Sequence, residues 1–327
     1  MQICVLSDSD LKEFDPSQYL RAYTWEMFIP QRPVIDFIGR LAEENHFDVY
    51  FNLCDGAENE KEDYSGSGIV CALEELRLPF TGANSCFYDP SREEMQSIAE
   101  ANGIRFARGV NIRDLDELSH LESLRYPLMV KHPHSFASTA MTRNSRVEAP
   151  SKLREQVKRI CNRFGSARVE EFIEGAEFTV LVVDNPDDLN DLFVYPPAEL
   201  ILPPGENFLH ARVKWKEWVY LKPVNDRALS LKLMEMARAM YIAMHGVGYA
   251  RCDIRMGRDG NLYMIEINPN SGILFKPEDL GPADVMMEYD AEGHAGFLDR
   301  IFRAAVIRNK AQIKPTTKQE CQLQNQN

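Results

Sequence analysis

Residues 249–268 read YARCDIRMGRDGNLYMIEIN, and this stretch decides the fold. Apolar runs flank Asp259-Gly260, a dipeptide typical of a two-residue hairpin turn, so we expect antiparallel strands at 249–256 and 261–268. In that register Asp253 faces Glu266. Because side chains alternate along a strand, the two faces differ in chemistry. One carries Ala250, Cys252, Ile254, Met256, Tyr263, Ile265 and Ile267, and the other Arg251, Asp253, Arg255, Glu266 and Asn268.

The polar face predicts a cation site. Two carboxylates and an amide oxygen packed together repel each other unless a cation or a proton joins them. Hard oxygen ligands of this kind suit Mg²⁺, which usually also bridges to phosphates. Arg251 adds a fixed positive charge that could stabilise a developing oxyanion. The alternative is a solvated sheet face with ordinary cross-strand Arg–Asp pairs, and the hairpin by itself does not decide between the two.

The totals fit a globular protein of two or three subdomains, with 327 residues, 44% of them hydrophobic and 27% charged. Lys and Arg number 37 against 50 Asp and Glu, a net charge of −13, which argues against nucleic acid as a main partner. The seven cysteines are an odd number without C-x-x-C spacing, as expected of a reducing compartment.

The ends of the chain and its apolar runs indicate a soluble, cytoplasmic protein. Residues 1–10 lack the basic start and the long apolar core of a signal peptide. No apolar run approaches the length that spans a bilayer, so we expect no membrane partner. Residues 310–327 are rich in Gln, Lys and Thr with little to bury, so we expect a mobile tail.

The first ninety residues alternate between strands and helices. Strands are expected at 2–6, 49–53 and 79–82, and helices at 32–45 and 69–78. This βαβαβ rhythm predicts a parallel sheet with helices on its faces. Ligands of such sheets bind beyond the carboxyl ends of the strands, so the loop at 55–68 is a candidate rim of a site.

The remaining chain predicts a smaller α+β region and a second one that holds the hairpin. A boundary falls near residue 89, because Ser91 and Glu94 form a capping box that starts a helix through residue 101. Strands are expected at 128–132, 168–173, 177–183 and 199–202, and helices at 152–163, 226–244 and 297–308.

Three further motifs could bind a nucleotide. Lys131 ends an apolar strand before a loop of small and hydroxyl residues, an arrangement that can hold phosphate, although locally an ordinary surface turn is the better explanation because the loop has no glycine. The carboxylate-rich turn at 170–177 could accept hydrogen bonds from an adenine amino group and ribose hydroxyls. Lys214, flanked by Arg212 and Lys216, could close over a triphosphate, or the segment 208–215 could be a solvated edge strand.

Together and in this order, the blocks resemble the ATP-grasp superfamily, in particular its D-alanine–D-alanine ligase branch, over roughly residues 48–308. The resemblance implies an α/β and α+β fold of three subdomains. These would be an N-terminal Rossmann-like parallel sheet (1–89), a central ATP-binding lobe (90–183) and a C-terminal antiparallel lobe with the metal site (184–309), followed by the tail at 310–327. Enzymes of this family phosphorylate a carboxylate with ATP, and an amine then displaces phosphate to form an amide.

The resemblance also assigns roles to individual residues. Asp253, Glu266 and Asn268 would bind two Mg²⁺ ions, for which Mn²⁺ can substitute. Arg251 and the Gly272 N–H would stabilise the tetrahedral intermediate. The ATP-binding positions correspond to Arg92, Lys131, Ser135 and Ser138 for the phosphates, Lys214 for the γ phosphate, and Glu170, Glu171, Phe172, Ile173 and Glu177 for adenosine.

Three departures from the branch concern the amino-acid substrates. Ala137, Trp215 and Pro277 stand where D-alanine ligases use serine, tyrosine and serine. We therefore expect small-molecule substrates other than two D-alanines, at least one of them an amino acid, and by analogy a possible homodimer. The alternatives are an ATP-grasp kinase, a ligase for another acceptor, or a non-catalytic nucleotide-binding regulator. Positions that could contact substrate are Asp8, Asp10, Glu58, Asn270, Ser271 and Lys276.

Overall fold

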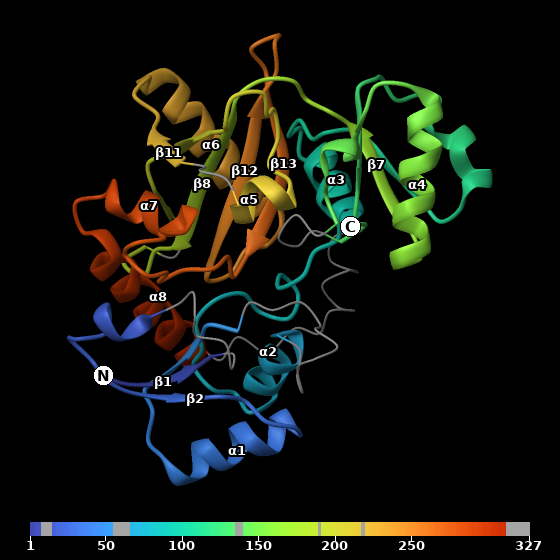
Figure 1. Ribbon diagram of the computed structural model, residues 1–327. Helices are drawn as coiled ribbons and strands as arrows, with labels where there is room; N and C mark the ends of the chain where they lie inside the picture. Colours follow the sequence, from blue (N-terminus) through green and yellow to red (C-terminus); the bar gives the residue numbers. More distant parts are fainter. Residues whose placement is uncertain (8–14, 55–65, 135–139, 189–190, 217–219, 312–327) are drawn as a thin grey trace.

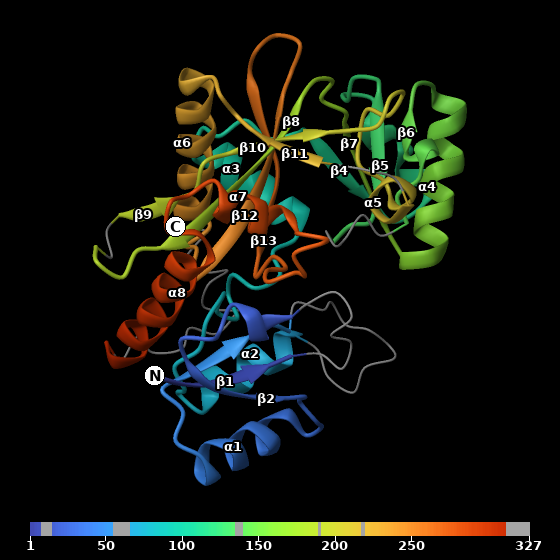
Figure 2. The same ribbon diagram turned by 60° about the vertical axis from the view of Figure 1, so that its left-hand side comes forward.

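A computed structural model describes residues 1–7, 15–54, 66–134, 140–188, 191–216 and 220–311. Three β-sheets organise this part of the chain. The parallel N-terminal sheet lies below, and two antiparallel sheets lie side by side above it (Figure 1). The turned view keeps this arrangement (Figure 2). The predicted mixture of α/β and α+β architecture is therefore confirmed.

The N-terminal sheet has the strand order β2-β1-β3, with both pairs parallel. Helices α1 and α2 cover one face through Ile38, Leu41, Ile69 and Leu73, while α8 packs on the other. The predicted strand at 79–82 forms one isolated bridge, between Tyr50 and Phe80. The elements are β1 (Gln2–Leu6), η1 (Pro16–Gln18), β2 (Thr24–Phe28), α1 (Val34–Glu44), β3 (Val49–Asn52) and α2 (Gly66–Glu75).

The central sheet has the order β4-β7-β5-β6, and all its pairs are antiparallel. Residues Leu128, Val130 and Val169 of this sheet pack against helix α4. Because side chains alternate, Lys131 and Glu170 project from the face that lies away from α4. The elements are β4 (Gly109–Ile112), η2 (Leu115–Leu121), β5 (Leu128–Lys131), η3 (Arg143–Ser145), β6 (Arg146–Val147), α4 (Pro150–Phe164) and β7 (Ala167–Glu171).

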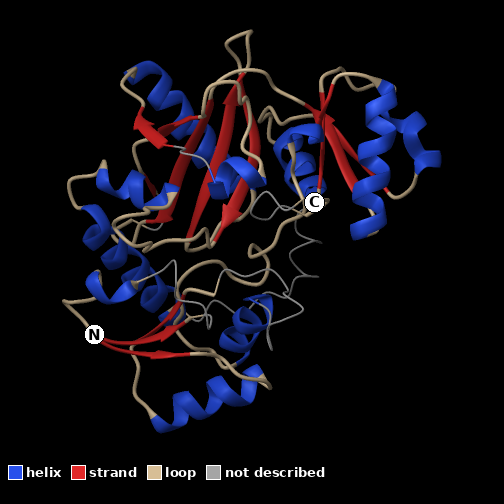
Figure 3. Ribbon diagram, in the orientation of Figure 1, coloured by secondary structure: helices blue, strands red, loops and turns tan. Residues whose placement is uncertain are grey.

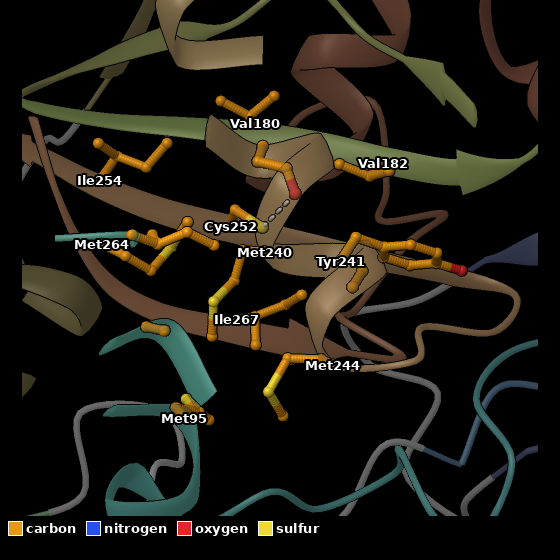
Figure 4. Close-up of a cluster of buried hydrophobic side chains, with 14 of the residues drawn as sticks. Met95, Val180, Val182, Met240, Tyr241, Met244, Cys252, Ile254, Met264 and Ile267 are labelled. Carbon is orange, nitrogen blue, oxygen red and sulfur yellow. Dashed lines mark hydrogen bonds between the residues drawn. The ribbon is translucent and has the colours of Figure 1, made fainter. Parts of the chain in front are cut away.

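The C-terminal sheet has the order β11-β10-β8-β12-β13, and β9 pairs with the edge of β8. Helices α6 and α3 bury one face of it with Val180, Cys252 and Ile267 at the centre (Figure 4). Helices α7 and α8 cover part of the other face (Figure 3). The elements are α3 (Arg92–Ala101), β8 (Glu177–Asp184), β9 (Leu192–Val194), β10 (Ala198–Ile201), α5 (Ala211–Lys216), β11 (Tyr220–Pro223), α6 (Arg227–Ala243), β12 (Tyr249–Met256), β13 (Leu262–Pro269), α7 (Pro282–Glu288) and α8 (Gly293–Lys310).

Strand β8 and helix α3, which the sequence analysis assigned to the central lobe, pack with the C-terminal sheet. Both belong to the core of the C-terminal sheet, where Met95 of α3 lies beside the apolar side chains of β13 (Figure 4). We therefore propose that the central lobe ends near Gly175 and that residues 92–101 form part of the C-terminal core. The segment at 208–215 contains the helix α5, so the edge-strand alternative for Lys214 is wrong.

The predicted hairpin forms with two corrections. The turn spans three residues, since Gly257 N–H binds the Asn261 carbonyl at 2.8 Å and Gly260 takes a φ of +76°. A bulge then leaves Ile265 without a partner and restores the predicted pairing of Asp253 with Glu266. Beyond the bulge the two faces exchange, so Leu262 and Met264 enter the core in place of Tyr263 and Ile265.

The loop at 80–83 docks on the base of the hairpin. Asn270 accepts a hydrogen bond from Ala83 N–H at 2.9 Å, and Arg308 donates to the Phe80 carbonyl at 2.6 Å. Gly248 lies so close that a Cβ atom there would be 2.3 Å from the Gly82 carbonyl oxygen. The N-terminal sheet is therefore held directly against the strand that carries the candidate site. Among the described helices, none is long and apolar enough to cross a membrane.

Candidate functional site

The polar face of the hairpin brings four predicted residues together. Arg251 donates two hydrogen bonds to Asp253, from Nε to Oδ1 at 3.0 Å and from Nη2 to Oδ2 at 2.9 Å. The Asn268 amide donates to Asp253 Oδ2 at 3.1 Å and to Glu266 Oε1 at 3.3 Å. The cross-strand pairs Arg251–Asn268 and Asp253–Glu266 produce this cluster, so the sequence prediction of their proximity is correct.

The Asp253 side chain is half-buried within the cluster. Burial raises the pKa of its carboxyl group, and the neighbouring charge of Glu266 adds to this effect against the opposing influence of Arg251. Thr179, which faces Asp253 across the β8–β12 pair, donates to its Oδ1 at 2.9 Å. The carboxylate is thus held in position before any cation arrives, and an added positive charge would favour its ionised form.

Two positively charged side chains from outside the hairpin lie near its polar face. Arg92, at the start of α3, forms an ion pair with Glu266 Oε2. Lys131, at the end of β5, forms an ion pair with Glu170 Oε1 on the neighbouring strand β7. Arg92 and Lys131 repel each other electrostatically, and Glu266 attracts both. The structure therefore gathers predicted phosphate-binding and metal-binding side chains at one place between the two antiparallel sheets.

Lys131 and Glu170 form a buried ion pair in the central lobe. Burial lowers the pKa of Lys131, although the Glu170 charge acts in the other direction. Burial alone would raise the pKa of Glu170, but Lys131, Arg92 and Arg168 outweigh it and hold that pKa below its ordinary value. Glu170 is therefore ionised at neutral pH, next to the side chains of Lys131, Arg92 and Arg168.

A cavity of about 420 Å³ is lined by Glu177 and Arg255, each two residues along its strand from the paired Thr179 and Asp253. Of the residues predicted to bind adenosine, Phe172 and Glu177 line it, whereas Glu170, Glu171 and Ile173 do not. The Glu171 carboxylate instead accepts a hydrogen bond from the Arg125 N–H at 3.1 Å. The remaining walls are Glu174, Gly175, Ala176, Leu200, Ile201, Leu202, Glu206, Asn207, Arg255 and Arg258.

Arg255 is the main residue that the sequence interpretation left without a role. Its side chain is 4% exposed, and its Nε donates to Glu177 Oε2 at 2.9 Å. Its other donors bind the carbonyls of Ile173 at 2.8 Å and Asn207 at 2.6 Å. The guanidinium also lies over the Phe172 ring, 4.6 Å from the centroid. The available signal was its two-residue spacing from Asp253, which places both side chains on one face.

Arg255 and Arg146 cover Phe172 from two sides. The Arg146 guanidinium lies 5.0 Å from the centroid of the same ring. Arg146 also forms ion pairs with Glu148 and Glu174, so its position is fixed from the central lobe. At Phe172 the wall of the cavity therefore consists of an aromatic ring between guanidinium groups that are themselves paired with glutamates.

The loop after β13 holds three positions predicted to contact substrate. The Asn270 oxygen accepts a hydrogen bond from the 80–83 loop, whereas its buried amide nitrogen has no hydrogen-bond partner in the part of the chain that the structure describes, so its contact with substrate stays a prediction. Ser271 is buried, and its hydroxyl has no hydrogen-bond partner among the described residues. Gly272 follows it directly, and Lys276 lies half-buried further along the loop. Ser271 and Gly272 therefore lie at the end of the strand that carries Glu266 and Asn268.

Buried Asp284 fixes the far end of this loop. It accepts hydrogen bonds from Leu274 N–H at 2.8 Å and Phe275 N–H at 3.3 Å, and from His294 Nε2 at 2.9 Å. Leu274 takes a φ of +60°, a conformation that a non-glycine residue adopts only when its surroundings hold it. The backbone beside Gly272 is consequently preorganised.

Several predicted positions lie outside the described residues, namely Asp8, Asp10, Glu58, Ser135 and Ser138, as do Ala137 and the tail at 312–327. The backbone of Lys214 forms part of α5, but its side chain lies outside the described set. The roles of these residues therefore stay predictions.

The donor set on the hairpin fits a hard divalent cation. No group of three or more His, Cys, Asp and Glu side chains in the described part of the chain could hold a metal ion, so the Asn268 amide is needed as the third ligand. That amide now directs its NH₂ toward both carboxylates. A half-turn about its terminal bond would present the oxygen instead, and two carboxylates with an amide oxygen suit Mg²⁺.

Two antiparallel sheets that face each other across an ionic cluster define the ATP-grasp class, whose ligases form C–N bonds. A family model described as "D-ala D-ala ligase C-terminus" matches residues 99–274, more than half of the chain. The chain belongs to this family, and the predicted resemblance is confirmed. It is an ATP-grasp ligase.

Individual relatives agree with this membership. The chain is 26% identical over 262 residues to the uncharacterized protein y4sG of Sinorhizobium fredii, covering 76% of this chain and 70% of that protein. It is 26% identical over 246 residues to a D-alanine–D-alanine ligase of Mannheimia succiniciproducens, covering 71% and 73%.

Solved structures share the fold at low sequence identity. The D-alanine–D-alanine ligase of Coxiella burnetii superposes with a TM-score of 0.68 at 17% identity, over 96% of both chains. The Bacillus anthracis D-alanine–D-alanine ligase in complex with ATP gives a TM-score of 0.65 at 17% identity, over 95% of this chain and 99% of that one. The likeness establishes the fold over almost the whole chain.

Proposed function

We propose that this ligase uses Mg-ATP to join the carboxylate of one small metabolite to the amine of another, at least one of them an amino acid. One observation carries the proposal. The proposed metal ligands Asp253, Glu266 and Asn268 lie close to the proposed phosphate-binding side chains of Arg92 and Lys131, between the two sheets. Metal-assisted phosphoryl transfer requires charge neutralisation and positioning, and this set of side chains can supply both.

The cavity beside Phe172 is proposed to take the adenosine. The B. anthracis homologue binds ATP, and our cavity opens onto the same side of β8 and β12 as the ionic cluster. Glu177 would contact the ribose, and Arg255 would orient Glu177 by its hydrogen bond. From this pocket the phosphates would extend toward Lys131, Arg92 and the hairpin, with Lys214 proposed at the γ phosphate.

In the proposed reaction a carboxylate oxygen of the first substrate attacks the γ phosphorus, and ADP leaves. The amine of the second substrate then attacks the acyl carbon, loses a proton and expels phosphate, which leaves an amide. Mg²⁺, when bound by Asp253, Glu266 and Asn268, neutralises the charge of the transferring phosphoryl group. Arg251 and the Gly272 N–H are proposed to stabilise the oxyanion of the tetrahedral intermediate.

The substrates are proposed to differ from a pair of D-alanines. Pro277, in the place of the branch's second serine, has no hydroxyl to donate to a carboxylate, whereas the half-buried Lys276 next to it could supply a positive charge. Ser271 adds a buried hydroxyl beside Gly272. The cytoplasmic location and the homodimer remain predictions from the sequence.

The proposal is tested by incubating the purified protein with ATP, Mg²⁺ and pooled amino acids, then measuring ADP release and product masses. A new mass equal to two substrates minus water is expected. Asp253→Asn should lower ADP release about 100-fold or more, since it removes a charge aimed at the reacting centre. The exposed Asp187→Asn serves as the matched control and should behave as wild type. A stable phosphorylated product, or no ADP above background, would refute the ligase assignment.

A further inference from the structure

Arg92 places a positive charge on an oxygen of Glu266, one of the proposed metal ligands. It is 5% exposed, and its guanidinium meets Glu266 Oε2, an oxygen of the proposed metal ligand. Helix α3 fixes this position, because Met95 one turn later belongs to the same buried apolar core as Ile267 of β13 (Figure 4). The ion pair is therefore built into the contact between α3 and the hairpin.

Every carboxylate oxygen of the proposed metal site accepts a hydrogen bond or an ion pair. Glu266 Oε1 accepts from Asn268, and Glu266 Oε2 pairs with Arg92. Asp253 Oδ1 accepts from Thr179 and from Arg251 Nε, while Asp253 Oδ2 accepts from Arg251 Nη2 and Asn268. A cation that approaches these oxygens meets the positive charge of Arg251 at Asp253 and of Arg92 at Glu266, and Arg92 reaches Glu266 from helix α3, outside the hairpin.

The surroundings offer Arg92 a second partner when a nucleotide is present. Lys131 lies near enough for mutual repulsion with Arg92, and both are proposed to contact phosphates. A triphosphate would thus attract Arg92 away from Glu266. Arginine suits this exchange, because its planar fork binds carboxylate and phosphate equally well in a bidentate manner.

We propose that Arg92 alternates between Glu266 and the phosphates of the nucleotide, so that nucleotide and metal ion bind together and free Mg²⁺ is excluded. This inference rests on the proposed function. Release of Glu266 by the nucleotide strengthens metal binding, and thermodynamic linkage requires the metal ion to strengthen nucleotide binding by the same factor. Couplings between sites of this kind usually lie between about 5- and 150-fold.

The experiment measures Mn²⁺ binding to the full-length protein by electron paramagnetic resonance, with and without a non-hydrolysable ATP analogue. Arg92→Gln removes the competing charge, so Mn²⁺ alone should bind at least about 5-fold more tightly than to wild type, and the enhancement by the analogue should shrink. Arg238→Gln, which removes a surface ion pair with Asp191, is the matched control and should bind Mn²⁺ as wild type does.

A second variant protects the test against a folding defect. Arg92→Lys keeps the charge but loses the fork, so its affinity for Mn²⁺ alone should lie between those of wild type and Arg92→Gln. Unchanged Mn²⁺ affinity in a folded Arg92→Gln, or an Arg92→Lys that binds Mn²⁺ as tightly as Arg92→Gln does, would overturn the role of the Arg92 charge. Wild type that binds neither the analogue nor Mn²⁺ in its presence would instead refute the proposed function itself.

Discussion

Gly248 offers a quantitative test of how the N-terminal sheet is held against the candidate site. Its φ is +80°, and a Cβ atom there would lie 2.3 Å from the Gly82 carbonyl oxygen. In Gly248→Ala the left-handed backbone costs about 1–2 kcal/mol. The clash adds about 1–3 kcal/mol, because the 80–83 loop is fixed by Arg308 and Asn270 and cannot yield freely. The free energy of unfolding should therefore fall by about 2–5 kcal/mol.

A matched control separates the backbone strain from the clash. Gly260 at the hairpin turn has a nearly equal φ of +76°, but a Cβ atom there would meet nothing within 4 Å. Gly260→Ala should lose only the conformational part, about 1–2 kcal/mol. Urea denaturation of both variants measures the difference. Equal losses in the two variants would mean that the contact between residues 82 and 248 does not restrain the loop, and the account of the docking would be wrong.

Three further predictions concern the site. Arg255→Met should leave Glu177 without its buried partner, lower stability by about 3 kcal/mol and weaken binding of an ATP analogue measured by calorimetry. The pKa of Glu170 lies below its ordinary 4.5 in the folded state, so its contribution to stability is present above pH 4.5 and is lost as pH falls through the folded value. The difference in unfolding free energy between wild type and Glu170→Gln should thus be constant near neutral pH and shrink in acid; a constant difference down to pH 2 would contradict this. Asp284→Asn should lower the kcat of the ligase with little change in the KM for ATP, since Asp284 orders the loop next to Gly272 and lies outside the cavity; a change in KM alone would exclude that role.

The hairpin shows what local sequence signals can and cannot supply. The predicted pairing of Asp253 with Glu266 is correct. The predicted two-residue turn is wrong, and so is the predicted buried face of residues 262–265. The three-residue turn shifts the register by one residue, and the bulge at Ile265 shifts it back. Nothing in the apolar pattern distinguishes this double shift from the simple two-residue turn, because residues 262–265 are all apolar.

One element that the sequence interpretation missed is short. Residues 24–28 (TWEMF) form a five-residue edge strand in which polar and apolar residues alternate for only two periods and no side chain is fully buried. The spacing of Arg255 from Asp253 indicated its face, but its contacts could not be predicted, since its partners Glu177, Ile173 and Asn207 come from distant segments. The helices with clear caps or stripes, such as α3 and α6, were placed within two residues of their true ends.

The outer end of the hairpin is a practical place to attach a reporter. The unpaired Ile265 separates the turn from the Asp253–Glu266 pair, so an altered turn length can be absorbed before it reaches that pair. Space around Gly260 is open, and neighbouring Arg258 pairs with Glu174 of the central lobe at 2.8 Å. A fluorophore or a short grafted peptide at this turn would therefore lie close to the central lobe and report changes in its distance from the hairpin. A labelled hairpin of this kind could serve as a metabolite biosensor.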